Sequence, residues 1–248
     1  VLVSPGKVDL ERFDGRFGGL LVRASGDITN PVRGSTGGQN TAAVSDSEGF
    51  VLPLDLAMME KIRPWLDVQA NGKPPRLDVR FSSDGSAESL VLGGSLNGSD
   101  FVWHGVPLKR ASATFSYDAP ANSLDVYSFQ IGHGEGTLSG VASLNLVSKV
   151  LELENTKSNV DPIALLSSFD AGMADKLKSV AVRDAPLIEL SGSIPLADVV
   201  NSEVEVNYDH LLGIVYTKDS RELPVSRIKS FIKLSGGVIT VEDTSCRV

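Results

Sequence analysis

Alternation of apolar and polar side chains is the dominant pattern of this chain. Leu138, Ala142 and Leu144 alternate with threonine, serine and asparagine, while Val204 and Val206 alternate with glutamate and asparagine. Successive side chains of a β-strand point to opposite faces, so this pattern predicts strands with one apolar face and one polar face. We therefore expect most of the chain to form a β-sheet that buries or uses a single apolar face.

Two segments depart from this alternation and predict short helices. In residues 161–180 apolar side chains recur at three- and four-residue spacing, with Asp161 as the N-cap and Pro162 at the first helical position. A shorter helix is expected over residues 53–65. Turn-type sequences such as Asn97-Gly98 separate the remaining segments at spacings that suit antiparallel hairpins.

The order of these elements repeats along the chain. The segment Val106-Pro107-Leu108-Lys109-Arg110 returns as Leu223-Pro224-Val225-Ser226-Arg227, 117 residues later (227 − 110). A second marker, residues 8–13, returns as residues 124–129, and residues 239–241 align with 124–126. We expect residues 1–50 to be the end of one repeat plus a Gly-rich loop, 51–155 a repeat unit, and 156–248 a second unit truncated at its C-terminal end.

Composition narrows the possible partners. The 248 residues carry a net charge of −8, which makes nucleic acid an unlikely partner. Cys246 is the single cysteine, so neither an intrachain disulfide nor a cysteine-based zinc site can form. The longest apolar stretches are far shorter than a membrane-spanning helix requires. Because the sequence begins at Val1 and both ends are strand-like, we interpret it as a piece of a longer protein.

Candidate catalytic chemistry is sparse. His104, His133 and His210 lie far apart and form none of the spacings typical of zinc ligands. The Gly-rich segment 132–136 lacks the Lys-Ser/Thr ending of a phosphate-binding loop and lies between strands, so it predicts a bulge or hairpin turn. No nucleophile elbow occurs. We expect no enzymatic activity, no cofactor and no metal.

The order of elements resembles the repeating unit of AsmA-like proteins. The similarity is carried by Asn159-Val160-Asp161-Pro162, then Ala185 to Gly192, then a strand pair and Leu223 to Arg227, and residues 74–146 show the same order. It covers about four fifths of the chain and rests on pattern and order, without an invariant signature residue. The resemblance implies a mainly β (α+β) fold, a long curved antiparallel sheet of repeated units shaped as a trough, with two short helices at the repeat starts.

The same resemblance implies a place and a role. AsmA-like proteins are usually anchored in the inner membrane of diderm bacteria, extend through the periplasm and are implicated in moving phospholipids toward the outer membrane. The implied partners are phospholipid acyl chains and further repeats at both sheet edges, with membrane contact only through parts outside this sequence. The candidate groove face is formed by Phe115, Tyr117, Leu138, Ala142, Leu144, Leu146, Val204, Val206, Ile228, Ile232 and Leu234.

The same sequence pattern is compatible with two other functions. Alternating strands commonly bury their apolar face in a closed core, which would make the chain a structural spacer or docking module without lipid. A carbohydrate-binding or adhesin-type β module would need clustered exposed aromatic residues, and the two tryptophans, Trp65 and Trp103, support it poorly. The discriminating feature is an apolar stripe that stays accessible along the sheet.

Overall fold

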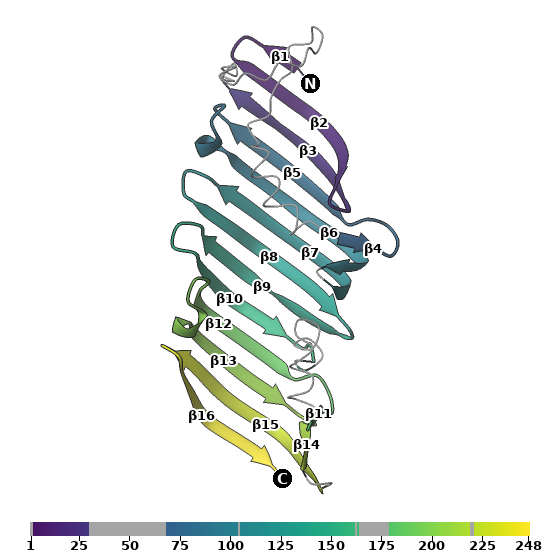
Figure 1. Cartoon of the computed structure of the whole chain (residues 1–248), viewed down its shortest axis with the longest axis vertical. Helices are drawn as coiled ribbons and strands as arrows, with labels where there is room; N and C mark the ends of the chain where they lie inside the picture. The colour runs from purple at the N-terminus through teal and green to yellow at the C-terminus, as the bar shows by residue number, and fades with distance from the viewer. Residues whose placement is uncertain (1, 30–67, 104, 162, 164–178, 219–220) are drawn as a thin grey trace, which may run out of the picture.

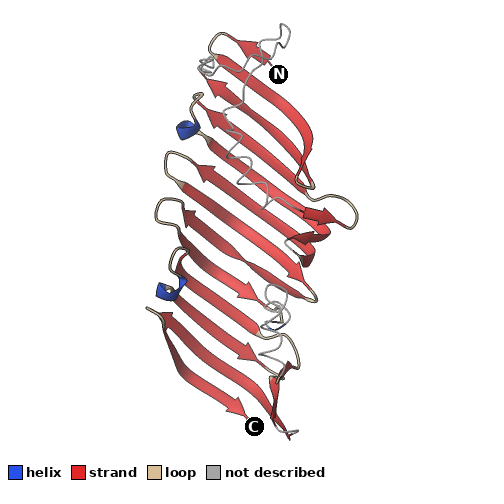
Figure 2. Ribbon diagram, in the orientation of Figure 1, coloured by secondary structure: helices blue, strands red, loops and turns tan. Residues whose placement is uncertain are grey.

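The computed structural model is almost entirely β-sheet (Figures 1 and 2). It describes residues 2–29, 68–103, 105–161, 163, 179–218 and 221–248. The mainly β prediction is confirmed. The helix expected over residues 53–65 lies outside the described residues, as does most of that expected over 161–180; in the described part, the helical elements of more than one residue are the 3-10 turns Ala87–Ser89 and Val199–Asn201. No described helix is long and apolar enough to cross a membrane.

Sixteen described strands form one open sheet, with the two ends of the chain at its opposite ends (Figure 1). The first eight strands are β1 (Leu2–Ser4), β2 (Lys7–Phe17), β3 (Leu20–Thr29), β4 (Val68–Ala70), β5 (Arg76–Ser83), β6 (Val91–Trp103), β7 (Val106–Asp118) and β8 (Ser123–His133). The remaining strands are β9 (Gly136–Asn145), β10 (Val150–Ser158), β11 (Val180–Val182), β12 (Leu187–Pro195), β13 (Glu203–His210), β14 (Ile214–Lys218), β15 (Arg221–Ser235) and β16 (Val238–Arg247).

Neighbouring strands are mostly consecutive in sequence. The sheet order is β1-β2-β3-β5-β6-β7-β8-β9-β10-β12-β13-β15, and β16 pairs with β15 at the end of the sheet. All described pairs are antiparallel except β3 and β5, which are parallel and therefore depart from the predicted antiparallel order. A parallel pair requires a connection that returns to the starting end of the first strand. Residues 30–67 of that connection lie outside the described residues, and its last part contains β4.

The strand order in the second part of the sheet matches that in the first. The two copies of the repeated sequence lie in β7 and β15, each the second strand of a hairpin. A three-residue strand pairs with the first strand of each hairpin, β4 with β6 and β11 with β14. The two strand sets differ at one place. In one set β3 pairs directly with β5, whereas in the other an additional strand, β10, lies between β9 and β12. The described sheet is therefore built from two similar, unequal strand sets.

The sheet is a single layer within the described residues. Its main contacts join hydrogen-bonded neighbouring strands, or a strand and the 3-10 turn next to it. The best buried apolar cluster lies at one flank, where β4 meets the β6–β7 hairpin, and consists of Leu20, Val68, Phe101, Val106, Leu108 and Ala111. No second described sheet lies over the broad middle of the structure, so its two faces differ only in the side chains that they carry.

Candidate functional site

One face of the sheet carries three continuous rows of apolar side chains. Cross-strand partners point to the same face, so the register of each pair extends a row to the next strand. The first row is Phe81, Leu92, Tyr117, Leu124, Leu144, Leu151 and Ile194. The second is Val79, Gly94, Phe115, Val126, Ala142, Leu153, Gly192, Val204, Leu234 and Ile239.

The third row contains Leu77, Leu96, Ala113, Phe129, Gly140, Thr156, Leu190, Val206, Ile232 and Val241. We call these three rows the apolar face. Thr156 is the one hydroxyl-bearing residue of the third row. The Thr156 side chain lies against Gly140. The rows cross the strands from β5 onward along the sheet (Figure 1). The first row ends at Ile194 of β12, and the second and third continue to β16.

Bulges keep these rows on one face. On β8, Leu124 and Val126 are even-numbered, but the register shifts before Phe129, so the odd-numbered Phe129 and Ile131 still point to the apolar face. On β10 a shift beside Asn155, which has φ of +48°, has the same effect. One extra residue in a strand reverses the alternation beyond it. Without these shifts, half of each strand would turn its apolar side chains to the opposite face.

The opposite face is polar and cross-linked by ion pairs. Lys157 Nζ lies 2.7 Å from Glu189 Oε1, and Lys229 Nζ lies 3.0 Å from Asp209 Oδ2 on the neighbouring strand. Lys233 Nζ lies 3.3 Å from Glu205 Oε1. All six of these side chains are largely exposed, and exposed pairs of this kind contribute little to stability. These ion pairs keep the polar face hydrated. An apolar ligand would therefore bind to the apolar face.

The apolar face is only partly shielded from solvent. Most of its side chains, Leu144, Val204 and Val206 among them, are half-buried by their own neighbours. At the last strand, exposure rises to 68% for Ile239 and 57% for Val241. Large contiguous apolar surfaces are rare on soluble proteins and mark sites of contact with another apolar surface. The arrangement suits a ligand held by hydrophobic contact alone.

Most of the predicted groove residues lie together on this face. Phe115, Tyr117, Ala142, Leu144, Val204, Val206, Ile232 and Leu234 all belong to the three rows. Leu138 and Ile228 lie at the flank, where Leu138 pairs with Ile131 and Ile228 pairs with His210. Leu146 lies in the turn after β9, where its N–H donates to the carbonyl of Asn122.

More than half of the apolar face was not predicted from the sequence. Leu124, Val126, Phe129, Leu151, Leu153 and Leu190 belong to it but were not among the candidates. For Phe129 the cause is a change of phase within β8, which a search for strict alternation discards. The other five lie in regular alternation, which was the signal that could have found them. The tryptophans give no aromatic binding platform, since Trp103 packs against the flank cluster and Trp65 lies outside the described residues.

Two phenylalanine rings lie flat on the face over glycines. A Cβ at Gly94 would approach the Phe115 ring to 2.9 Å, and a Cβ at Gly26 would approach the Phe81 ring to 2.7 Å. A Cβ would also meet a backbone carbonyl oxygen, that of Asp78 at 2.6 Å from Gly94 and that of Phe81 at 2.1 Å from Gly26. These close approaches of backbone and ring require glycine at both positions.

A buried polar cluster closes one flank of the face. His210 is almost fully buried, with Nε2 lying 2.7 Å from both the carbonyl oxygen and the Oδ1 atom of Asp184. Nε2 faces two acceptor oxygens and therefore donates, and the Tyr208 hydroxyl oxygen lies 2.8 Å from Nδ1. Burial raises the pKa of Tyr208, and the carboxylates of Asp184 and Asp161 act in the same direction because they repel a phenolate.

The raised pKa of Tyr208 predicts a loss of stability in alkali. The folded chain holds the phenolic proton more tightly than the unfolded chain, so this contribution is complete below the usual tyrosine pKa of 10.0 and is lost as the pH rises through the raised pKa of the folded chain. We expect the urea concentration at the unfolding midpoint to decrease as the pH is raised from about 9 to about 11. The decrease should be smaller in Tyr208→Phe. Tyr127→Phe, at a tyrosine that is 60% exposed, is the control and should follow the wild type. Equal slopes in all three proteins would contradict the expectation.

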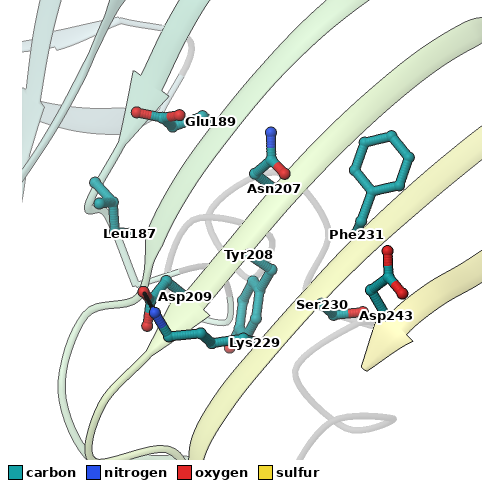
Figure 3. Close-up of a pocket in the computed structure, with 9 residues that line it drawn as sticks. All are labelled: Leu187, Glu189, Asn207, Tyr208, Asp209, Lys229, Ser230, Phe231 and Asp243. Carbon is teal, nitrogen blue, oxygen red and sulfur yellow. Dashed lines mark ion pairs between the residues drawn. The ribbon is translucent and has the colours of Figure 1, made fainter. Parts of the chain in front are cut away.

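The polar face holds an open depression of about 500 Å³ over β12, β13 and β15 (Figure 3). Its floor includes Glu189, Asn207 and Phe231, which are cross-strand partners on the polar face. Glu189 and Asp209 are already paired with lysines. These side chains therefore form a largely charge-compensated surface and not a free carboxylate pair for acid and base catalysis.

The structure describes some of the other residues singled out in the sequence, namely the Gly-rich segment, His133 and Asp161. The Gly-rich segment 132–136 is the tight hairpin between β8 and β9, which confirms the predicted turn, and His133 donates from Nδ1 to the carbonyl of Pro107 at 2.9 Å. His104 lies outside the described residues. Among the residues that the structure describes, no three histidine, cysteine or acidic side chains are grouped to hold a metal ion. The Asp161 carboxylate accepts the N–H of Ile163, as expected of an N-cap.

Comparisons with protein-family models, with curated proteins and with solved structures give no match.

Proposed function

We propose that the apolar face binds phospholipid acyl chains and that the chain is a non-enzymatic segment of an AsmA-like envelope protein. The observation that carries this proposal is the set of three continuous apolar rows, partly exposed along the sheet, with a charged face on the other side. A surface with this division of polarity favours a ligand that is apolar over a long distance. Acyl chains have that property, whereas peptides and sugars need directional polar contacts.

The dimensions and energetics fit such a ligand. Adjacent strands lie about 4.8 Å apart, so the rows that cross ten strands from β5 to β16 extend over roughly 43 Å. Each methylene shielded from water contributes about 0.8 kcal/mol, and none of this requires a fixed register between ligand and protein. Flat rings and small residues along the rows would let a chain slide. The same features would shield the acyl chains of different phospholipids with little selectivity.

The proposed setting comes from the resemblance to AsmA-like repeats. In that setting the segment lies in the periplasm, its parent protein is anchored in the bacterial inner membrane, and the apolar face shields acyl chains that move between the inner and outer membranes. Headgroups would remain in water at the flanks of the rows. No nucleic acid and no cofactor enters this role.

Native mass spectrometry tests the proposal directly. The protein should be purified from bacterial membranes, and the same sample extracted for lipids and incubated with a fluorescent phospholipid. We expect co-purifying phospholipid and saturable uptake of the fluorescent analogue. Lipid-free protein that also fails to take up the analogue would contradict the proposal and would favour the alternative, a spacer or docking module without lipid.

A further inference from the structure

Two neighbouring connections carry exposed aliphatic side chains on the flank of the sheet opposite β4 and β11 (Figure 1). They are the turn between β9 and β10 and the loop between β12 and β13, joined by a hydrogen bond of 2.8 Å from the Leu196 N–H to the Lys149 carbonyl oxygen. Exposure reaches 73% for Val147 and 67% for Val200. We call the following five residues the flank tips: Leu146, Val147, Leu196, Val199 and Val200.

The fold does not require apolar residues in the second of these connections. The loop between β5 and β6 is its counterpart in the first strand set, and each loop contains a three-residue 3-10 turn, Ala87–Ser89 in one and Val199–Asn201 in the other. The sequence Ala-Glu-Ser thus forms the same turn as Val-Val-Asn, and Glu88 is exposed there. Two exposed valines in place of alanine and glutamate therefore indicate contact with an apolar partner.

Hydrogen bonds inside the protein satisfy backbone N–H groups in both connections. In the turn, Asn145 Oδ1 accepts the N–H groups of Val147 at 3.0 Å and Ser148 at 2.9 Å. In the loop, carbonyl oxygens of the same loop or of the preceding Pro195 accept the N–H groups of Asp198, Asn201 and Ser202. A backbone group that enters lipid without a partner is costly, so this internal bonding suits segments that leave water for a bilayer.

The composition and position of the flank tips favour a lipid partner over a protein partner. Residues that dominate binding between proteins are enriched in tryptophan, tyrosine and arginine, and residues 146–149 and 196–202 contain none of these three. The tips also continue the apolar face. Leu146 follows Leu144 by two residues, and Leu196 follows Ile194 by two residues, where Leu144 and Ile194 belong to the first apolar row.

We infer that the flank tips insert into the boundary between headgroups and acyl chains of a lipid bilayer and so dock this flank of the sheet on a membrane. The attraction comes from buried apolar area. Charge does not supply it, because the chain carries a net charge of −8 and is repelled by anionic lipids. The docking stands by itself; that acyl chains then enter the first row from this flank rests on the proposed function.

Flotation of the full chain with phosphatidylcholine vesicles tests the docking. We expect the protein to float, and to float no better when the vesicles contain phosphatidylglycerol. Val199→Ala with Val200→Glu, which copies the counterpart turn, should bind at least about tenfold more weakly, because two apolar side chains no longer leave water. Gln130→Glu adds the same charge on the polar face and should bind as the wild type does. Circular dichroism verifies that both variants are folded.

A dye at a single cysteine locates the contact. Val200→Cys and Glu88→Cys, each combined with Cys246→Ser, place an environment-sensitive dye on the two counterpart turns. On vesicles we expect a blue shift and quenching by spin-labelled acyl chains at position 200, and neither at position 88.

Three results would overturn the inference: no flotation of the wild type, equal flotation of the valine variant, or equal dye responses at the two positions. A stable dimer that the valine variant loses would also overturn it, by making a second copy the occupant. Uptake of monomeric fluorescent phospholipid without flotation would support the proposed function and contradict the docking. Flotation without uptake would do the reverse.

Discussion

Replacing Leu144 and Val206 by aspartate is expected to reduce lipid uptake by at least about tenfold. Leu144 lies in the first apolar row and Val206 in the third, so the two carboxylates would stand beneath any chain that lies along the face. A hydrated carboxylate cannot be covered by an acyl chain without losing its water, which costs several kcal/mol. Fluorescent phospholipid uptake and the lipid content of the purified protein measure this effect.

A matched variant separates the face from the added charge. Gln130→Asp with Asn145→Asp also adds two negative charges on β8 and β9, but both residues lie on the polar face and are exposed. This variant should bind lipid as the wild type does. Circular dichroism and urea unfolding should confirm that both variants remain folded. Equal loss of lipid in the two folded variants would show that net charge decides binding and would contradict the proposed role of the apolar face.

Gly213→Ala is expected to produce the largest loss of stability among the single substitutions considered. Gly213 joins β13 to β14 with φ of +75°, and a Cβ at this position would lie 1.8 Å from the Val225 carbonyl oxygen. The substituted chain must therefore move the backbone of β15 as well as adopt a left-handed conformation with a side chain. We expect the free energy of unfolding to fall by about 3 kcal/mol or more, measured by urea denaturation.

Gly134 provides the control for backbone conformation alone. It has φ of +57° in the β8–β9 hairpin, and a Cβ there would meet no atom within 4 Å. Gly134→Ala should cost about 1 kcal/mol, the usual penalty for an alanine in the left-handed region. If the two substitutions cost the same, the close approach of Gly213 to β15 would not be a determinant of stability.

The division between the two faces was largely predictable from the sequence. Val204 and Val206 alternate with glutamate and asparagine, and the structure places them on one face with Leu234 and Ile232. The β8–β9 hairpin was also predictable, because a Gly-rich segment between two alternating strands needs a tight turn. What strict alternation could not find was the second half of β8, since Phe129 and Ile131 are out of phase with Leu124.

The complete apolar face could not be predicted without knowing which strands are neighbours. A bulge is defined by the partner strand, so the shift before Phe129 becomes visible only when β7 and β9 are in place. The parallel pairing of β3 with β5 likewise joins segments separated by many residues. His210 was one of three isolated histidines in the sequence, and only folding brings it to Asp184, whereas Tyr208 lies two residues away on the same strand.

The sequence by itself determined that this protein is a repeated β-sheet with one apolar and one polar face. That information is local, because a period of two and a turn residue act within a few positions of the chain. The tertiary structure decided which strands are neighbours, where the bulges restore the phase of the rows, and that the described sheet is a single layer. These features depend on contacts between strands far apart in sequence, which local periodicity does not encode.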